Sequence, residues 1–439
     1  MSEHVDANGR RRPTRGVDAP REPSRFRTRA VHAGAETGDD AWPLSEPISL
    51  SAVYACRDPA IADARSAADP PLPNYGRDGT PNVRALERAV AELEEADDAH
   101  AVASGMAAIA LTALTHLAAG RHVVASADCY GDARRLLADE LRRFGVRCTL
   151  VDMTDRAAVD GAVAADTAMI YAETIANPSM KLIDVAALAE TARRRGALLC
   201  IDNTFATPAL CRPLRHGADL VVHSATKFLG GHHDLTAGVV AGRGDLIAAI
   251  RRCGQLYGPT LGPVDAWLAL RGIRTLAPRV AWMSATAQAV ATFLADHPAV
   301  AAVRYPGSPC HPQAALARRL LPNGAGGMLA FDLAGGRPAA ERLIRGLNLI
   351  PYALSFGGVS TTVCIPPPVD RRAGAVGAIR MSVGLEAADD IIADLAQALA
   401  EIALTPNPSP TAAGEGRTVG AAATRGLPLA RRNGRGGRG

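Results

Sequence analysis

Lysine is nearly absent from this sequence. Its 439 residues include only two lysines, Lys181 and Lys227, against 46 arginines. An arginine side chain keeps its proton in proteins, so it cannot act as a nucleophile or bond covalently to an aldehyde. A lysine can do both once burial or a neighbouring cation lowers its pKa. Because lysine is kept only where arginine cannot replace it, these two residues are the first candidates for chemistry.

Aromatic residues are also scarce, at 4% of a chain that is 48% hydrophobic. The core is therefore predicted to consist mainly of aliphatic side chains, and the length allows two or three domains. The uncharged stretch 101–120 is long enough to raise the question of a membrane span. Ala, Gly, Ser and Thr dominate it, which favours a helix packed inside an α/β domain and no membrane partner.

Several motifs are missing, and each absence excludes a class of function. No Gly-Lys pair exists, which rules out a P-loop, and neither G-x-S-x-G nor H-E-x-x-H occurs. The run from His232 to Asp234 lacks a spaced third ligand, so no metal site is predicted. The eight cysteines show no C-x-x-C spacing, and no apolar signal segment opens the chain. Both features favour reduced thiols in a cytoplasmic protein.

Positive charge gathers at the two ends of the chain. Residues 1–29 carry a net charge of +4 and residues 405–439 carry +5, whereas the remainder is mildly acidic. Residues 1–24 and 405–439 are predicted to be disordered basic tails, because their composition cannot bury apolar surface. A tail set by composition is favoured over contact with nucleic acid, which is an unlikely partner.

The chain between the tails divides into three predicted parts. Residues 25–75 are interrupted by prolines and read as an extended arm that contacts a neighbouring subunit. Residues 76–275 alternate strand-like and helical runs, which predicts a large α/β domain around a mainly parallel sheet. Residues 276–404 form a second, smaller α/β domain. The strands expected in the large domain are 99–103, 122–125, 146–151, 168–172, 197–201 and 220–223, with helices between them, for example over 133–144 and 185–195. The strands expected in the smaller domain lie near 328–333 and 379–383.

Lys227 lies in a stretch whose neighbours suit a phosphorylated aldehyde. It follows the strand-like run 220–223 and the hydroxyl residues Ser224 and Thr226, and two glycines come shortly after it. Hydroxyls can bind a phosphate and a lysine can bind an aldehyde, a combination that pyridoxal 5'-phosphate (PLP) carries in one molecule. The alternative is a surface lysine in a turn.

Two other strand ends carry residues that fit the same cofactor. Ser104, Gly105 and Met106 follow a strand and open a helix, where free backbone N–H groups bind phosphate. Asp202 ends the strand 197–201, and a carboxylate there could pair with a protonated pyridine nitrogen. The alternatives are close packing of small residues for the first and an Asx turn or helix cap for the second.

Three further side chains point to the same crevice, since active sites of parallel sheets gather at the carboxyl ends of strands. Tyr130 follows the strand 122–125 and could stack on a flat cofactor, and Asn177 follows the strand 168–172. Arg380 lies on a strand of the smaller domain, and its planar guanidinium suits a substrate carboxylate. Each of these residues taken alone would be read as structural.

With these residues identified, the chain resembles the Cys/Met-metabolism, trans-sulfuration family of PLP enzymes from residue 28 to residue 402. The most specific run is IDNTFATPALCRPLRHGADLVVHSATKFLGGHHD. The other matching runs are YGRDGTPNVRALE, ASGMAAI, DCYGD, ETIANPSMKLID, LRGIRTL, SFGGVST and RMSVGLE. The resemblance implies the aspartate aminotransferase-like fold, called PLP fold-type I. It also implies a homotetramer built from two active-site dimers.

The resemblance also implies roles for individual residues. Lys227 would bind the cofactor covalently and move protons between the substrate carbons and the cofactor, Asp202 would pair with the pyridinium, and Tyr130 would stack on the ring and take part in catalysis. The implied phosphate ligands are Gly105, Met106, Ser224 and Thr226, joined by Tyr75 and Arg77 of the neighbouring subunit.

The substrate side is where the sequence departs from the family. Arg380, supported by Ser355 and Asn177, would bind the substrate carboxylate. Ser360 stands where cystathionine synthases and several lyases usually have Glu, and Asp132 stands where relatives often have Gly or Cys. The runs DCYG and LRGIRTLAPR most resemble cystathionine γ-synthase, the first choice. Cystathionine and methionine lyases, O-acylhomoserine sulfhydrylases and a PLP-binding regulatory protein are the alternatives.

Overall fold

The computed structural model describes residues 25–35, 41–68, 74–366 and 378–404. The chain divides into two units, Met1–Leu404 and Thr405–Gly439. The predicted basic tails, residues 1–24 and 405–439, lie outside the described residues. The boundaries predicted between an arm, a large domain and a small domain stay a prediction.

A seven-stranded sheet forms the centre of the first half of the described chain, with the strand order β1-β7-β6-β5-β4-β2-β3. Strands β2, β3, β4, β5 and β6 pair in parallel, whereas β7 is antiparallel to both β1 and β6. The predicted mainly parallel sheet is confirmed, although the sequence analysis did not predict β7. The strands are β1 (Asp98–Val102), β2 (His122–Ser126), β3 (Arg147–Val151), β4 (Thr167–Glu173), β5 (Leu198–Asp202), β6 (Leu220–Ser224) and β7 (Gly238–Gly242).

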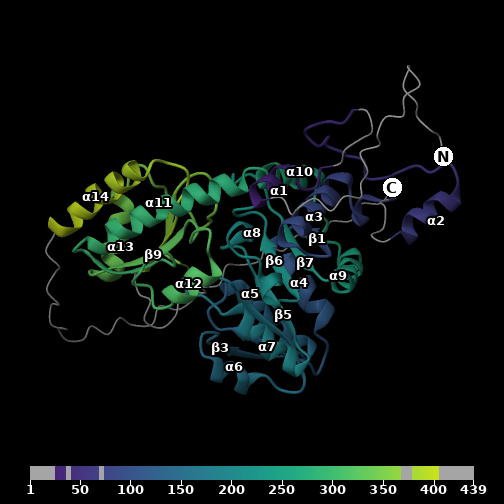
Figure 1. The fold of residues 1–439 in the computed structure, drawn as a ribbon, viewed down its shortest axis with the longest axis horizontal. Helices are drawn as coiled ribbons and strands as arrows, with labels where there is room; N and C mark the ends of the chain where they lie inside the picture. Colours follow the sequence, from purple (N-terminus) through teal and green to yellow (C-terminus); the bar gives the residue numbers. More distant parts are fainter. Residues whose placement is uncertain (1–24, 36–40, 69–73, 367–377, 405–439) are drawn as a thin grey trace, which may run out of the picture. The chain divides into compact units, whose positions relative to one another are not determined.

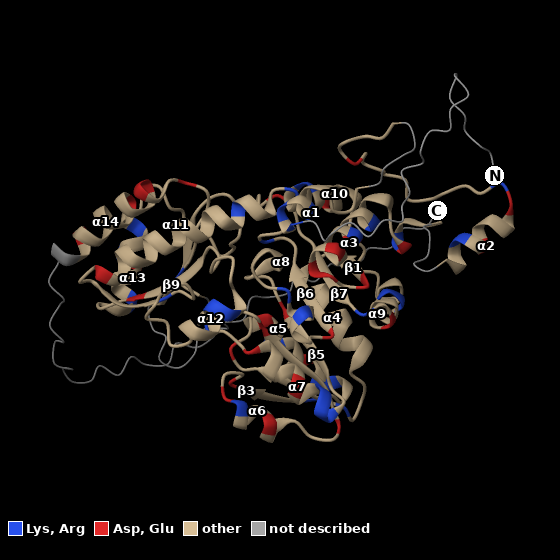
Figure 2. Cartoon of the chain, in the orientation of Figure 1, with Lys and Arg blue, Asp and Glu red and all other residues tan. Residues whose placement is uncertain are grey.

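Both faces of this sheet are covered, which explains why its strands read as continuous apolar runs. Along β5, Leu199 and Ile201 face one core and Cys200 faces the other. Figure 2 shows the central strands largely free of charge and the charged residues on surrounding helices such as α6 and α9. Helices that pack in the first core include α3 (Pro81–Glu94), α6 (Arg156–Ala162), α7 (Val185–Arg195), α8 (Thr207–Leu210) and α10 (Pro263–Ile273). Helices that pack in the second include α4 (Gly105–His116), α5 (Gly131–Arg135) and α9 (Gly244–Tyr257).

A four-stranded antiparallel sheet follows, in the order β10-β11-β9-β8. Figure 1 shows its strand β9 beside the helices α11 and α13. The sheet packs against three helices around a separate core that includes Phe331, Ile379 and Leu395. The second, smaller α/β region is thereby confirmed, with β8 and β10 added to the expected strands. Its elements are α11 (Leu276–Asp296), β8 (Val300–Arg304), α12 (Ala314–Leu320), β9 (Met328–Leu333), α13 (Gly336–Gly346), β10 (Thr362–Cys364), β11 (Ala378–Ser382) and α14 (Ala388–Leu404).

The segment 25–75 is not extended throughout, because it contains the helices α1 (Phe26–His32) and α2 (Pro59–Ala67). Pro59 begins α2 instead of breaking it, since its fixed φ suits the first turn and the Asp58 carboxylate accepts the N–H of Ala60 at 2.8 Å. The segment also exposes apolar side chains, including Leu44 and Leu50.

One local prediction differs from the structure. The continuous helix expected over 133–144 is divided into α5, a π-helical turn and a 3-10 turn, which together bury Leu137 and Leu141 in one core. The uncharged stretch 101–120 holds α4, and no helix in the described residues is long and apolar enough to cross a membrane. The remaining short elements are η1 (Gly76–Asp78), η2 (Leu136–Glu140), η3 (Leu141–Phe144) and η4 (Pro213–His216).

Arg279, near the start of α11, fixes the turn that follows Lys227. Its guanidinium is buried and donates hydrogen bonds to the carbonyl oxygens of Phe228 at 2.8 Å and Gly272 at 2.7 Å. Burial lowers the pKa of Arg279 to about 10. One buried cation thus joins the turn after Lys227 to the end of α10, where the Gly272 carbonyl also accepts from Thr275.

Replacing this cation by an apolar side chain should destabilise the protein. We expect Arg279→Met to lower the free energy of unfolding by about 3 kcal/mol, because the carbonyl oxygens of Phe228 and Leu229 lose the hydrogen bonds that Arg279 donates. Arg271→Met, the same change at an exposed position of α10, should change it by less than about 0.5 kcal/mol. Equal midpoints of thermal unfolding for the two variants would contradict the prediction.

Candidate active site

A cavity of about 370 Å³ lies where the carboxyl ends of the parallel strands β4, β5 and β6 meet the smaller sheet. It is the site that the rule for parallel sheets predicts. The sequence-predicted residues that line it are Gly105, Met106, Tyr130, Asn177, Asp202, Ser224, Thr226, Lys227 and Arg380.

One end of the cavity is built from backbone N–H groups and hydroxyls. Helix α4 begins at Gly105, after the Ser104 hydroxyl caps it by accepting the N–H of Ala107 at 3.1 Å. The first N–H groups of a helix have no acceptor within the helix, and the helix dipole favours an anion there. The hydroxyl residues Ser224 and Thr226, on the loop and strand facing this turn, line the same cavity.

Glycine is required for this close approach. A Cβ built on Gly105 would lie 2.7 Å from the Cβ of Ser224, and one on Gly238 of β7 would overlap the carbonyl oxygen of Ser104. The start of α4 therefore rests directly on β6 and β7. The tight contact brings donors from segments more than 100 residues apart in the sequence to one anion-binding end.

Asp202 presents its carboxylate to the cavity from the end of β5. The carboxylate accepts the N–H of Thr204 at 2.9 Å and faces the hydroxyl of buried Tyr171 at 3.4 Å. Burial raises the pKa of Asp202 above its ordinary value, against the opposing effect of the Thr204 hydrogen bonds. A cation bound beside Asp202 would stabilise its ionised form.

Lys227 points its amine into the cavity from the turn after β6. The amine donates a hydrogen bond to the hydroxyl of Ser355 at 2.8 Å and lies 4.7 Å from the ring centre of Phe356. Burial and, second, the positive charge of Arg380 lower the pKa of Lys227 to about 8. A substantial fraction of this amine is therefore neutral near physiological pH, as a nucleophile requires.

Arg380 reaches the cavity from β11 of the smaller sheet. Its guanidinium donates to the side-chain oxygen of Asn177 at 3.0 Å and to the carbonyl of Leu354 at 2.9 Å. It also lies 4.9 Å from the ring centre of Phe356. These contacts fix the orientation of the Arg380 guanidinium, and its positive charge faces the cavity that also holds the Lys227 amine.

Tyr130 and Asp132 form the opposite wall. The Tyr130 hydroxyl donates to the Asp132 carboxylate at 2.9 Å, and both residues line the cavity. Glu173, at the end of β4, accepts the backbone N–H groups of Tyr130 at 2.6 Å and Asn177 at 2.9 Å. One carboxylate therefore orients two of the predicted site residues.

Sequence reasoning missed Glu173 and Phe356 as site residues. Glu173 ends an apolar strand in the same way as Asp202, and this shared position is a signal that could have identified it. Nothing around Phe356 in the sequence distinguishes it from a core residue, because its contacts with Lys227 and Arg380 arise only in the folded chain.

Three of the predicted residues do not line the cavity. Ser355 contacts it indirectly, through its hydrogen bond with Lys227. Tyr75 and Arg77 lie on the surface beside the 3-10 turn η1, with the Arg77 guanidinium 5.5 Å from the Tyr75 ring centre. Ser360 is exposed, and within the described residues no group of three His, Cys, Asp or Glu side chains could hold a metal ion.

Comparison with known proteins identifies the family of this site. The model of the Cys/Met metabolism PLP-dependent enzymes matches residues 27–400. The chain belongs to this family. It is 39% identical to an O-succinylhomoserine sulfhydrylase of Pseudomonas aeruginosa over 88% of this chain and 98% of that protein. It is 40% identical to an L-methionine γ-lyase of Pseudomonas deceptionensis over 86% and 98% of the two chains.

Solved structures agree with this assignment. The structure of cystathionine γ-lyase from Lactobacillus plantarum, complexed with L-serine, matches with a TM-score of 0.80 and 34% identity, covering 87% of this chain and 100% of that chain. The fold is PLP fold-type I, and the protein is a PLP-dependent enzyme of sulfur amino-acid metabolism, as predicted, and not merely a regulatory binding protein.

The cavity fits this cofactor. The Gly105 cradle and the hydroxyls of Ser224 and Thr226 offer donors for a phosphate, and a Cβ at Gly105 would close that end. Asp202 offers a carboxylate for a pyridinium, and Lys227 offers an amine whose pKa of about 8 suits covalent attachment to an aldehyde.

The pKa of Lys227 predicts how cofactor attachment depends on pH. The rate at which PLP attaches to the apoprotein should rise through about pH 8 and then level off, because only the neutral amine reacts. Arg380→Met removes a neighbouring positive charge and should move this midpoint upward. Borohydride trapping at a series of pH values, followed by peptide mass spectrometry, measures both curves. A rate that keeps rising to the ordinary lysine pKa of 10.5 would contradict the prediction.

Proposed function

We propose that the protein catalyses a γ-replacement on an O-acylhomoserine, in which the acyl group leaves and the sulfur of cysteine takes its place, as in a cystathionine γ-synthase. The proposal rests on one observation, that Lys227, Asp202, Tyr130 and Arg380 all line a single cavity. A γ-replacement needs a proton carrier, an electron sink and a carboxylate anchor, and these four residues supply or support each of them.

Lys227 and Asp202 serve the cofactor. PLP, when bound, supplies an electron sink that stabilises negative charge on the substrate carbons. Lys227 binds the cofactor covalently, and its amine, with a pKa of about 8, can accept a proton from the substrate Cα and return it near neutral pH. Asp202 keeps a positive charge on the pyridine nitrogen, and the hydrogen bond from Thr204 orients its carboxylate.

The phosphate is held by the anion-binding end and by a second subunit. The N–H groups of the turn at Gly105 and Met106 and the hydroxyls of Ser224 and Thr226 bind it from within one chain. Tyr75 and Arg77 reach it from the neighbouring subunit of a homotetramer made of two active-site dimers, a role consistent with their exposure and their distance from the cavity of their own chain.

The remaining residues serve the substrate. Arg380 binds the α-carboxylate. The side-chain oxygen of Asn177 accepts a hydrogen bond from the Arg380 guanidinium and so orients it. Ser355 supports the same anchor. Tyr130 stacks on the cofactor ring, and its hydroxyl donates to the Asp132 carboxylate, which adds negative charge at the leaving-group side.

A second candidate is elimination, as in a C–S lyase. Two observations favour it: relatives that include a methionine γ-lyase, and the two departures from the synthase pattern, exposed Ser360 and cavity-lining Asp132. Both reactions share every cofactor contact and differ only in whether an external thiol completes the reaction.

Substitution of the two lysines by arginine tests the assignment of Lys227. Lys227→Arg keeps the positive charge but cannot lose its proton, so covalent cofactor attachment and turnover should fall to background. Lys181→Arg is the matched control, because arginine can keep the ion pairs of Lys181 with Asp128 and Asp152. We expect it to retain activity within about threefold, as surface substitutions do. Turnover by the Lys227→Arg protein at the native rate would refute the role of Lys227.

A substrate panel separates the two candidate reactions. O-acetylhomoserine or O-succinylhomoserine with cysteine should yield cystathionine, and 2-oxo acid should form only slowly when the thiol is left out. Sulfide replaces cysteine in a parallel assay to detect sulfhydrylase activity. Rapid release of 2-oxo acid from methionine or cystathionine, without any thiol acceptor, would favour the lyase and contradict the proposed replacement.

A further inference from the structure

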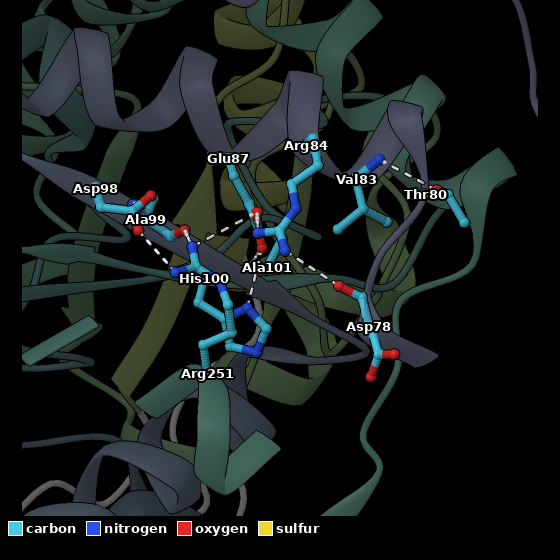
Figure 3. A network of polar contacts seen from close by, with 10 residues as sticks. All are labelled: Asp78, Thr80, Val83, Arg84, Glu87, Asp98, Ala99, His100, Ala101 and Arg251. Carbon is cyan, nitrogen blue, oxygen red and sulfur yellow. Dashed lines mark hydrogen bonds and ion pairs between the residues drawn. The ribbon is translucent and has the colours of Figure 1, made fainter. Parts of the chain in front are cut away.

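A buried carboxylate outside the cavity joins several parts of the chain. Glu87, on α3, is 3% exposed. One of its oxygens accepts the backbone N–H of Ala101 and faces Nδ1 of His100, each at 2.9 Å, and the other accepts a hydrogen bond from Arg84 at 2.6 Å (Figure 3). Glu87 does not line the cavity of Lys227.

Arg84 extends this network to the turn η1. While one of its terminal nitrogens binds Glu87, the other donates to the backbone carbonyl of Asp78 at 3.1 Å (Figure 3). Asp78 is the last residue of η1, next to Arg77, and Tyr75 directly precedes the turn. The guanidinium therefore bridges α3 and the turn with two hydrogen bonds in a fixed fork.

On its other side, Glu87 is tied to the strand that leads to the anion-binding end. Ala101 and His100 lie on β1, which ends two residues before Ser104. Arg251, from α9, donates to the carbonyl of Ala99 at 2.8 Å and pairs with Asp98 at 2.8 Å, which holds the same strand from a third element.

The cost of burying this charge argues for a positional role. Burial alone would raise the pKa of Glu87, but the His100 hydrogen bond and the charges of Arg84 and Arg251 lower it to about 2. A buried ion pair adds little net stability compared with apolar residues of similar shape. Its directional hydrogen bonds do, however, fix the relative positions of the segments that it joins.

We propose that Arg84 and Glu87 are positioning residues that fix η1 against α3 and β1, so that Tyr75 and Arg77 are held in place to bind the cofactor phosphate of the neighbouring subunit. This inference rests on the proposed function, which assigns Tyr75 and Arg77 to the neighbouring site. The pair links the two cofactor sites of an active-site dimer: β1 leads to the phosphate turn of its own chain, and η1 serves the partner.

Arg84→Lys is the most selective test. The lysine ammonium keeps a positive charge for Glu87 but cannot bridge Glu87 and the Asp78 carbonyl with the geometry of a guanidinium. The dissociation constant for PLP, measured by titrating the apoprotein, should rise roughly tenfold for the loss of one charge-assisted hydrogen bond. Arg304→Lys is the matched control, because Arg304 forms a similar two-point pair with Asp332, at 2.6 and 2.9 Å, in the smaller sheet. It should leave the constant unchanged.

Mixed oligomers then show in which subunit the pair acts. In a mixed oligomer of Arg84→Lys and Lys227→Arg chains, one kind of cofactor site takes its Lys227 from the Arg84→Lys chain. The same site takes its η1 from the Lys227→Arg chain, in which Arg84 is native. Such sites should bind PLP with the native dissociation constant, as measured by native mass spectrometry of the hybrids. Glu87→Gln should behave in the same way, and it serves as the test variant if Arg84→Lys does not fold.

The outcomes separate this inference from the function on which it rests. An unchanged dissociation constant in Arg84→Lys, or weak binding that persists in the mixed oligomers, would overturn the positioning role. If, in addition, Lys227→Arg chains alone still attached the cofactor covalently, the proposed function itself would fail. Weak binding that recovers in the hybrids, together with no attachment in Lys227→Arg chains, supports both.

Discussion

The active site depends on burying the Lys227 amine beside a hydroxyl and an aromatic ring, without pairing it with a carboxylate. Lys227 lies in a cavity where it contacts a hydroxyl and an aromatic ring, and Arg380 adds a second positive charge nearby. Both effects favour the neutral amine, which is the reactive form. The arrangement has an energetic cost, because two cationic groups share one crevice. The rest of the fold has to hold them there.

The large sheet provides this support by ending its parallel strands at one edge. β4 ends at Glu173, β5 at Asp202 and β6 at Ser224, and each of these residues lines the cavity. The covered faces bury the apolar side chains of the strands, while the polar residues at the strand ends line the cavity. Glu173 orients its neighbours through their backbone N–H groups, so a substitution of Tyr130 or Asn177 need not disturb the position of the main chain.

A second group of contacts acts at a greater distance. Arg279 holds the turn after Lys227 from α11, and the Arg84–Glu87 pair holds η1 against α3 and β1 (Figure 3). None of these side chains lines the cavity. In both cases a largely buried guanidinium donates to a backbone carbonyl of another segment, that of Phe228 for Arg279 and that of Asp78 for Arg84. Arginine is suited to this task because its fork reaches two acceptors at once. The sequence is rich in arginine and poor in lysine, which agrees with the use of arginine for structural hydrogen bonds and of Lys227 for chemistry.

The strand and helix alternation, the family and the chemically active residues of the cavity could all be predicted from the sequence. Apolar runs that end in Asp, Ser or Lys are local patterns, and the parallel sheet brings such ends together whatever the details of packing. Strand β7 escaped prediction because GVVAG is short and glycine-rich, and its antiparallel position between β1 and β6 is a matter of pairing. The contacts of Phe356, the two backbone hydrogen bonds of Glu173 and the bridge from Arg84 to Asp78 became visible only in the folded chain. These residues come into contact only when the chain folds, so no local sequence pattern predicts the interactions.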